Sequence, residues 1–225
     1  MTTPENTPIA LAIGIPTINR KDLLDEAIKL KYHWTFFARK VLIIDNGKQG
    51  IEVKKPWRVI NTHQNFGVAG SWNLICAILF RAGYTHVLIL NDDIIIDKHA
   101  EEIEEFIKEN PADIYHSQNH FCAFIIDRWT FAELGPFDDR FWPAYYEDND
   151  YVYRAKLAGK KVMPTPFLDP VVFRNSQSIA KQPELNHNFN LNRQRYIEKW
   201  GGLPTEEKYT VPFNGVEQKP IINIP

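Results

Sequence analysis

The stretch HVLILNDDIII, residues 86–96, sets a strand-length apolar run directly against a polar cluster. Its first five residues have the length and composition of a buried strand, and the run ends at Asn91-Asp92-Asp93. Two adjacent carboxylates within otherwise apolar sequence are costly to bury unless something compensates their charge. The stretch therefore predicts a strand inside the fold whose carboxyl end is polar.

Strands and helices alternate outward from this stretch. Further strands are expected at residues 9–15, 41–44, 57–60, 121–126 and 171–173. Helices are expected at residues 21–31, 68–81, 98–108, 128–134, 147–157 and 191–200. Alternation of this kind is typical of an α/β fold, in which a parallel sheet has helices on both faces.

Composition and charge narrow the function classes. The 225 residues are 44% hydrophobic and 24% charged, as in ordinary globular domains, and the net charge is −2. Lys and Arg are scattered, which argues against nucleic acid or an anionic membrane as the main partner. The N-terminus does not resemble a signal peptide, and no apolar run approaches the ~20 residues of a membrane span. With Cys76 and Cys122 expected as free core thiols, we expect a soluble, cytoplasmic protein.

Polar residues follow the carboxyl ends of the strands, where open α/β sheets bind their ligands. They are Thr17, Asn19 and Arg20 after the first strand, Asp45 after the second, and Asn91 to Asp93 after the fourth. Carboxylates at a strand end can hold a hard cation such as Mg²⁺ or Mn²⁺. The alternative is that they only shape the turn and cap the next helix.

The segment NTHQNFGVAGSWN, residues 61–73, leads from a loop into a helix. Gly67 and Gly70 allow close approach to the backbone, and a helix N-terminus favours phosphate. Asn65 and Asn73 are candidate ligands, although capping and loop–loop hydrogen bonds explain them equally well.

The block FDDRFWPAYYEDND, residues 137–150, combines aromatic residues with three acids within its last four positions. Glu147, Asp148 and Asp150 open a helix, where capping would explain one acid but leaves room for another role. Trp142, Tyr145 and Tyr146 could form a platform for a sugar ring, or belong to the core as Phe137 and Phe141 are expected to do. Arg154 is expected to pair with Asp150 along the helix.

Together these segments resemble family 2 glycosyltransferases of the GT-A fold, especially their bacterial and viral rhamnosyltransferase-like branch. The markers occur in the family's order over residues 9–202: PTINR, DNG, NFGVAGSWN, LNDD, FDDRFWPAYYEDND and RYIEKWGG. The resemblance implies a Rossmann-like, mostly parallel central sheet flanked by helices. One domain would cover residues 1–202, with a nucleotide-binding half at about 9–110 and a mixed acceptor half at about 111–202. Residues 203–225 are expected to form an extended tail or linker.

The resemblance also implies roles for single residues. Asp93 would be a ligand of Mn²⁺ or Mg²⁺, and Asp148 would be the catalytic base. The nucleotide-sugar would contact Thr17, Asn19, Arg20, Asp45, Asn65, Gly70, Asn73, Asn91, Asp92 and Arg174. The acceptor would contact Trp142, Tyr145 and Glu147.

One position departs from the family pattern. Many relatives carry a metal-binding histidine after the strand that follows the Glu-Asp helix, and this sequence has Arg174 there. Either Arg174 contacts the diphosphate, or His187 reaches the metal from the next segment, or the metal has a single firm protein ligand.

The sequence thus predicts an inverting, metal-dependent transferase that moves a sugar from a UDP- or dTDP-linked donor to a glycan or other acceptor hydroxyl. A catalytically silent sugar-binding module is a rival interpretation. A sugar nucleotidyltransferase is another, but it would be expected to carry a glycine-rich, basic loop where this chain has PTINRKDLL.

Overall fold

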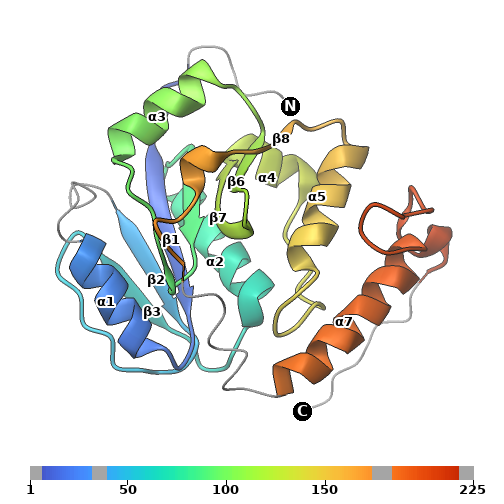
Figure 1. The fold of residues 1–225 in the computed structure, drawn as a ribbon, viewed down its shortest axis with the longest axis horizontal. Helices are drawn as coiled ribbons and strands as arrows, with labels where there is room; N and C mark the ends of the chain where they lie inside the picture. The colour runs from blue at the N-terminus through green and yellow to red at the C-terminus, as the bar shows by residue number, and fades with distance from the viewer. Residues whose placement is uncertain (1–6, 32–39, 174–183, 218–225) are drawn as a thin grey trace.

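A seven-stranded sheet, in the order β3-β2-β1-β4-β7-β6-β8, forms the centre of the protein (Figure 1). The computed structural model describes residues 7–31, 40–173 and 184–217. The strands are β1 (Leu11–Thr17), β2 (Val41–Asp45), β3 (Arg58–Asn61), β4 (His86–Leu90), β6 (Ile114–Ser117), β7 (His120–Asp127) and β8 (Val162–Pro164). A separate antiparallel pair joins β5 (Ile94–Ile95) to β9 (Val172–Phe173).

The helices surround this sheet. They are α1 (Lys21–Lys31), α2 (Gly67–Arg81), α3 (Ala100–Glu109), α4 (Arg128–Leu134), α5 (Glu147–Leu157) and α7 (Glu184–Trp200), with short 3-10 turns η2 (Pro166–Leu168) and η3 (Pro212–Gly215). The expected α/β class is therefore confirmed. Strands β1 to β4 run parallel to one another. By contrast, β7 is antiparallel to β4, and β6 is antiparallel to β7. The second half is mixed, as expected.

The strand order reverses beside β1. The chain winds from β1 to β2 and β3 on one side, and then returns to place β4 on the other side of β1. This is a topological switch point, the place at which open α/β sheets bind their ligands. The residues that follow β1 and β4 border it.

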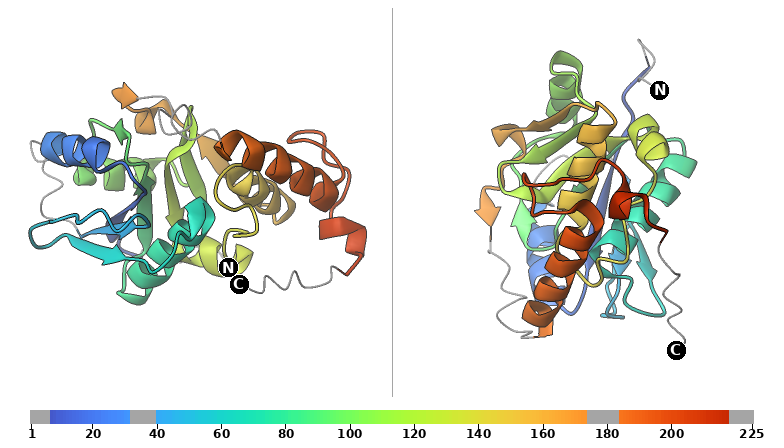
Figure 2. Two further views of the ribbon diagram at one scale, coloured as in Figure 1. Left: turned by 90° about the horizontal axis from the view of Figure 1, so that it is seen from below. Right: turned by 90° about the vertical axis from the view of Figure 1, so that its right-hand side faces the viewer.

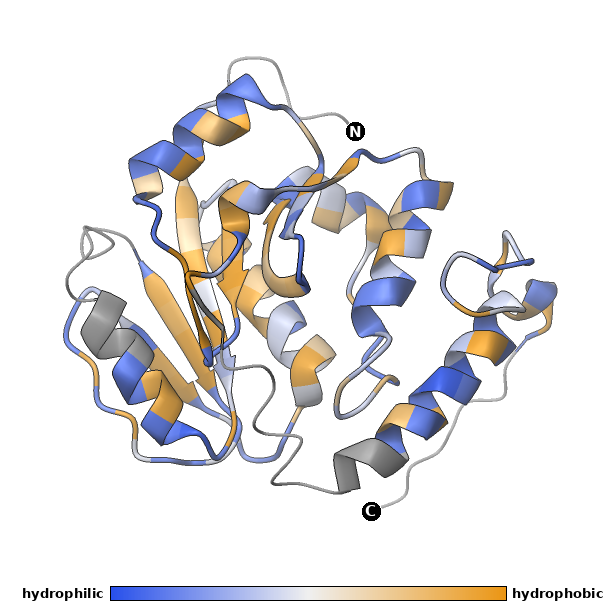
Figure 3. Ribbon diagram, in the orientation of Figure 1, coloured by the Kyte–Doolittle hydropathy of each residue, from blue (hydrophilic) through white to orange (hydrophobic). Residues whose placement is uncertain are grey.

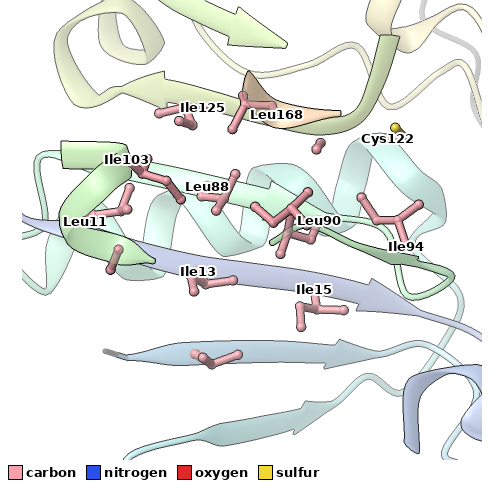
Figure 4. Packing of buried hydrophobic residues seen from close by; sticks show 14 of the residues in the cluster. Leu11, Ile13, Ile15, Leu88, Leu90, Ile94, Ile103, Cys122, Ile125 and Leu168 are labelled. Atoms are coloured by element: carbon pink, nitrogen blue, oxygen red, sulfur yellow. The ribbon is translucent and has the colours of Figure 1, made fainter. Parts of the chain in front are cut away.

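Successive residues of the strands pack into two different cores. Leu11, Ile13 and Ile15 of β1 face one core, which receives apolar side chains of α1 and α3 (Figure 4). Ala12 faces the other, which is filled by α2 and α5. Figure 3 shows the consequence, with strands that are hydrophobic along their length between helices whose outer faces are hydrophilic. The continuous apolar runs in the sequence reflect this double covering.

A third cluster joins α5 to α7, which lies farther from the sheet (Figure 2). Its aromatic members are Phe141, Tyr146, Tyr153, Tyr196 and Trp200. The segment after α7 folds back onto this cluster within residues 203–217. Tyr153 donates a hydrogen bond to the carbonyl of Tyr209 at 2.9 Å, and Tyr196 donates one to Glu207 Oε1 at 2.5 Å.

Both cysteines, Cys76 and Cys122, are buried and free, in agreement with the expectation of core thiols. Among the described helices, none combines the length and the apolar composition that crossing a bilayer requires.

His86 makes the stability of the fold depend on pH. It begins β4, is 5% exposed, and has its Nδ1 3.0 Å from Thr85 Oγ1. Burial lowers the pKa of His86 from 6.5 to about 4. A depressed folded pKa contributes stability that is present above the unfolded pKa and is lost as pH falls through the folded value. Protonation of His86 should therefore cost about 3 kcal/mol between pH ~7 and pH ~4.

We expect His86→Gln to reduce this acid-induced loss of stability, measured by urea unfolding across the same pH range. His63→Gln, at an exposed position, is the control and should leave the pH dependence as it is in the unmodified protein. An equal loss in His86→Gln and in the unmodified protein would contradict the assignment.

Candidate active site

The strand-end residues predicted from the sequence meet at the switch point. Thr17, the last residue of β1, is 3% exposed, and its Oγ1 donates a hydrogen bond to Asp92 Oδ2 at 2.6 Å. Asp92 follows β4, so this bond crosses the reversal in strand order. The backbone N–H of Asn91 donates to the carbonyl of Cys122 at 2.9 Å, which keeps the end of β4 against β7.

Asp45 lies fully buried at the end of β2. Its carboxylate accepts hydrogen bonds from the N–H of Gly47 at 2.9 Å, the N–H of Gln49 at 2.6 Å and Gln49 Nε2 at 3.0 Å. Gln49 Nε2 also lies 3.3 Å from Thr17 Oγ1. A chain of hydrogen bonds thus runs from Asp45 through Gln49 and Thr17 to Asp92.

Gln49 was not anticipated from the sequence. Its place just after the Asp45-Asn46-Gly47 turn is the only signal that could have indicated it.

Asn19 and Arg20 complete the β1 side of the switch point. Arg20 is 4% exposed and donates from Nε to Asp22 Oδ1 at 3.1 Å, and this hydrogen bond lowers the pKa of Asp22. Asn19 has a left-handed backbone with φ of 52°. A Cβ added to Gly47 would lie 2.7 Å from Asn19 Oδ1. The segment after β1 is thereby packed against the turn after β2.

Asp93 is half-buried and follows Asp92 at the same strand end. Burial raises the pKa of the Cys122 thiol, and the Asp93 charge contributes to the rise, so Asp93 lies near β7. Ile94 pairs with Phe173, which brings the end of β9 next to Asp93. Arg174 lies outside the described residues. His187 belongs to α7, but its side chain also lies outside the described part of the chain.

The donor set fits a divalent cation only in part. Among the described residues, no group of three or more His, Cys, Asp or Glu side chains is placed to hold a metal ion. Mg²⁺-type sites commonly use one or two carboxylates and take their remaining ligands from water and substrate phosphates. Asp93 and Asp92 at the switch point fit that arrangement, in which a diphosphate would supply the missing oxygens.

The loops before α2 and α5 are joined. Trp142 Nε1 donates to the carbonyl of Asn65 at 3.1 Å, and the N–H of Val68 donates to the carbonyl of Pro143 at 2.8 Å. Asn65 Oδ1 accepts from the N–H of Gly67 at 2.8 Å. These contacts fix the position of the Trp142 ring, which remains 48% exposed.

Asn73 and Gly70 lie on α2 near the same loops. Asn73 exchanges two hydrogen bonds of 2.8 Å with the backbone of Phe137, donating from Nδ2 and accepting at Oδ1. Gly70 is tightly packed, since a Cβ there would lie 3.0 Å from Phe66 Cβ. In this structure Asn73 therefore links α2 to the loop before α5.

Strained backbone precedes the acids of α5. Tyr145 and Tyr146 both have left-handed backbone angles, with φ of 79° and 73°, which residues other than glycine rarely adopt. The Tyr145 ring is half-buried and packs on Phe189 with centroids 5.2 Å apart. Phe137 and Phe141, at 1% and 0% exposure, are core residues as expected.

The three acids of α5 have different surroundings. Asp150 is fully buried and bonded by Arg154 Nε at 2.9 Å, which confirms the expected pair. It also binds Lys199 Nζ at 2.5 Å and Trp200 Nε1 at 2.8 Å, so its role is structural.

Glu147 is 5% exposed. Asp148 is half-buried and accepts two hydrogen bonds of 2.8 Å from Asn149, both at Oδ1. Within the described residues, none donates to Asp148 Oδ2.

The hairpin of β6 and β7 connects the two acidic ends of the site. His116 of β6 has its pKa lowered by burial, and the charge of Asp148 opposes that shift. The charge of Asp93 likewise raises the pKa of Cys122 of β7, where it adds to the effect of burial. Asp93 and Asp148 thus both act electrostatically on the same hairpin.

Comparison with known proteins assigns the family. The family model described as "Glycosyl transferase family 2" matches residues 12–161, more than half of the chain. The chain belongs to glycosyl transferase family 2. It is thereby placed among the glycosyltransferases. No curated protein matches it in sequence.

Solved structures show the same fold as this family 2 member. The mannosyltransferase PcManGT from Pyrobaculum calidifontis, in complex with GDP-Man and Mn²⁺, matches with a TM-score of 0.63 at 12% identity over 89% of this chain and 67% of that one. S. aureus TarS 1-349 in complex with UDP-GlcNAc has a TM-score of 0.61 at 14% identity, over 84% and 66%. GalNAc-T7 with UDP, GalNAc and Mn²⁺ has a TM-score of 0.65 at 12% identity, over 86% and 49%. The chain thus spans between half and two thirds of these proteins, and the expected GT-A-type α/β fold is confirmed.

The bond between Thr17 and Asp92 should contribute to nucleotide binding in this family 2 member. Thr17→Val keeps the shape of the side chain and removes the donor, so Asp92 loses a charge-assisted hydrogen bond. We expect nucleoside diphosphate affinity to fall about tenfold, measured by calorimetry. Thr17→Ser keeps the hydroxyl and should bind nearly as the unmodified protein does. Unchanged affinity in Thr17→Val would show that the bond does not organise the nucleotide site.

Proposed function

We propose that the chain is an inverting, metal-dependent glycosyltransferase that moves a sugar from a UDP- or dTDP-linked donor to a hydroxyl of a glycan or glycoconjugate. The observation that carries the proposal is the position of Asp148. It lies at the start of α5 with one oxygen available, near a hairpin that also lies near Asp93. Family membership and this pair of carboxylates support a transferase over a silent binding module.

The donor nucleotide would bind at the switch point. Thr17, Asn19, Arg20 and Asp45 would contact the base and ribose, and Gln49 joins them because it is bonded to Asp45 and Thr17. Asn91 and Asp92 would face the ribose from the β4 side. Asn65, Gly70, Asn73 and Arg174 remain proposed contacts of the nucleotide-sugar. The relatives bound to GDP-Man and UDP-GlcNAc support a nucleotide-sugar donor as a class.

The acceptor would bind on the α5 side. Trp142 offers a fixed and half-exposed ring in the loop before α5, and Tyr145 and Glu147 lie between it and Asp148 in the sequence. Aromatic faces suit the apolar face of a sugar ring, and carboxyl groups suit its hydroxyls. The order of motifs supports the rhamnosyltransferase-like branch, and with it a deoxysugar donor.

Asp148 would accept the proton of the attacking hydroxyl while the bond between the anomeric carbon and the diphosphate breaks. This single displacement inverts the configuration and passes through a transition state of oxocarbenium character, as in glycoside hydrolysis. A divalent cation held by Asp93, with help from Asp92 and His187, would offset the negative charge of the leaving diphosphate.

Replacing the base should abolish transfer without loss of the fold. Asp148→Asn removes the proton acceptor, and we expect sugar transfer to fall at least ~100-fold, measured by release of nucleoside diphosphate in the presence of acceptor. Asp139→Asn, an exposed acid of the same sequence block, is the control and should keep its activity. Full transfer by Asp148→Asn would refute the base assignment.

A thermal-shift screen should identify the donor nucleotide and the role of Asp93. UDP, dTDP, GDP and CDP would each be tested with and without Mn²⁺, since a ligand that binds the native state raises Tm by mass action. We expect UDP or dTDP to raise Tm by several degrees only with Mn²⁺, and Mn²⁺ alone to have little effect because the protein supplies few ligands. Asp93→Ala should lose the Mn²⁺-dependent part of this increase in Tm. An Mn²⁺-dependent shift that persists in Asp93→Ala would rule out Asp93 as the metal ligand.

A further inference from the structure

Within the described residues, Glu147 is a buried acid without a cationic partner. It is the first residue of α5 and is 5% exposed. Its Oε2 is buried and accepts no hydrogen bond in the described part of the chain. Of the described residues, the titratable groups that interact with it are Asp148, its neighbour on α5, and Tyr145 in the preceding loop. Neither can balance a negative charge on Glu147.

The surroundings of Oε2 indicate which form of the carboxyl they suit. The backbone N–H groups of Glu147 and Tyr145 favour the ionised form of the carboxyl, but the described residues place no donor on the buried Oε2. A protonated carboxyl puts no charge on this oxygen. An ionised carboxylate would instead leave a charged oxygen buried and unpaired, which costs far more than a neutral one.

Burial is the main effect that raises the pKa of Glu147 well above its ordinary value, and the charge of Asp148 raises it further. The two backbone donors oppose this rise. Asp148 is half-buried and bonded by Asn149, so it is better placed to carry the charge of the pair.

We propose that Glu147 keeps its proton in the working enzyme and donates a hydrogen bond from its neutral carboxyl to an oxygen of the bound acceptor, while Asp148 alone carries the negative charge of the pair. The acceptor part of this inference rests on the proposed function. The protonated state of Glu147 rests on its burial and contacts alone. Glu147 then positions the acceptor, and the uncharged neighbour does not repel the charge on Asp148.

Infrared spectroscopy tests the proton directly. The carbonyl stretch of a protonated carboxylic acid is separated from the bands of ionised carboxylates and amides. We expect such a band at neutral pH in the unmodified protein, and we expect Glu147→Gln to lack it. Glu109→Gln, at an exposed acid near the end of α3, is the control and should retain the band. A spectrum in which Glu147→Gln removes no protonated-acid band would overturn the proposal.

The pH dependence of stability provides a second measurement. A raised folded pKa contributes stability that is fully present below the unfolded value of about 4.5 and is lost as pH rises through the folded value. Glutamine cannot ionise, so Glu147→Gln should match the unmodified protein at pH ~4 and exceed its Tm by a few degrees at pH ~8. A Tm for Glu147→Gln below that of the unmodified protein at the higher pH would show that Glu147 is stabilised as an ion.

Acceptor kinetics test the hydrogen bond. Glu147→Gln keeps an N–H donor at this position, whereas Glu147→Leu removes it. We expect the KM for acceptor to rise about tenfold in Glu147→Leu and clearly less in Glu147→Gln, with the KM for donor little changed in both. Equal acceptor KM in Glu147→Leu and the unmodified protein would overturn the positioning role. If the protein transferred no sugar at all, the proposed function would fail, while the infrared and stability measurements would still decide the protonation of Glu147.

Discussion

Helices cover both faces of the central sheet, and this constraint determines where polar chemistry can occur. In β1, Ile13 and Ile15 pack on one side and Ala12 on the other, so this central strand has no wet face on which to place a polar group. Polar side chains are left with the strand ends. The hydrogen-bond chain from Asp45 to Asp92 lies there, and it crosses the switch point through Thr17.

The acceptor half depends instead on a buried ion network. Lys199 is 4% exposed and binds Asp138 at 2.7 Å and Asp150 at 2.5 Å. Trp200 donates to the same Asp150 carboxylate. Such a network is specific because loss of any member would leave an uncompensated charge in a site of low dielectric constant. It connects α7 to α5, and it therefore keeps Asp148 at a defined position although Asp148 takes no part in it.

The sequence predicted those features that depend on local pattern. His86–Leu90, Arg128–Leu134 and Glu147–Leu157 begin and end where apolar spacing and turn residues indicated. It did not reveal β5, β6 or β8, although it indicated β3 and β9, which are equally short. Strands of two to four residues carry little pattern of their own and are defined by the segments with which they pair.

For the site, the family motifs indicated Thr17, Asp45 and Asp92, whose bonds converge in the structure. Gln49 was not predicted, since no local pattern distinguishes its amide from that of any other loop glutamine. The resemblance gave Glu147 and Asp148 different roles, but it could not indicate their different burial, because residues far away in the chain decide it. Arg174 and the side chain of His187 lie outside the described residues, so their roles remain predictions.

The contact between the loops before α2 and α5 has a consequence for how the protein can change. Gly67 has no space for a side chain, because a Cβ would lie 2.7 Å from the carbonyl oxygen of Pro143 and 2.9 Å from Trp142 Cδ1. The two loops are therefore packed as one unit, although one belongs to the proposed donor half and the other to the proposed acceptor half. A substitution that reshapes the surface around Trp142 also changes the packing at the start of α2. Under the proposed function, acceptor preference and donor affinity are therefore energetically coupled.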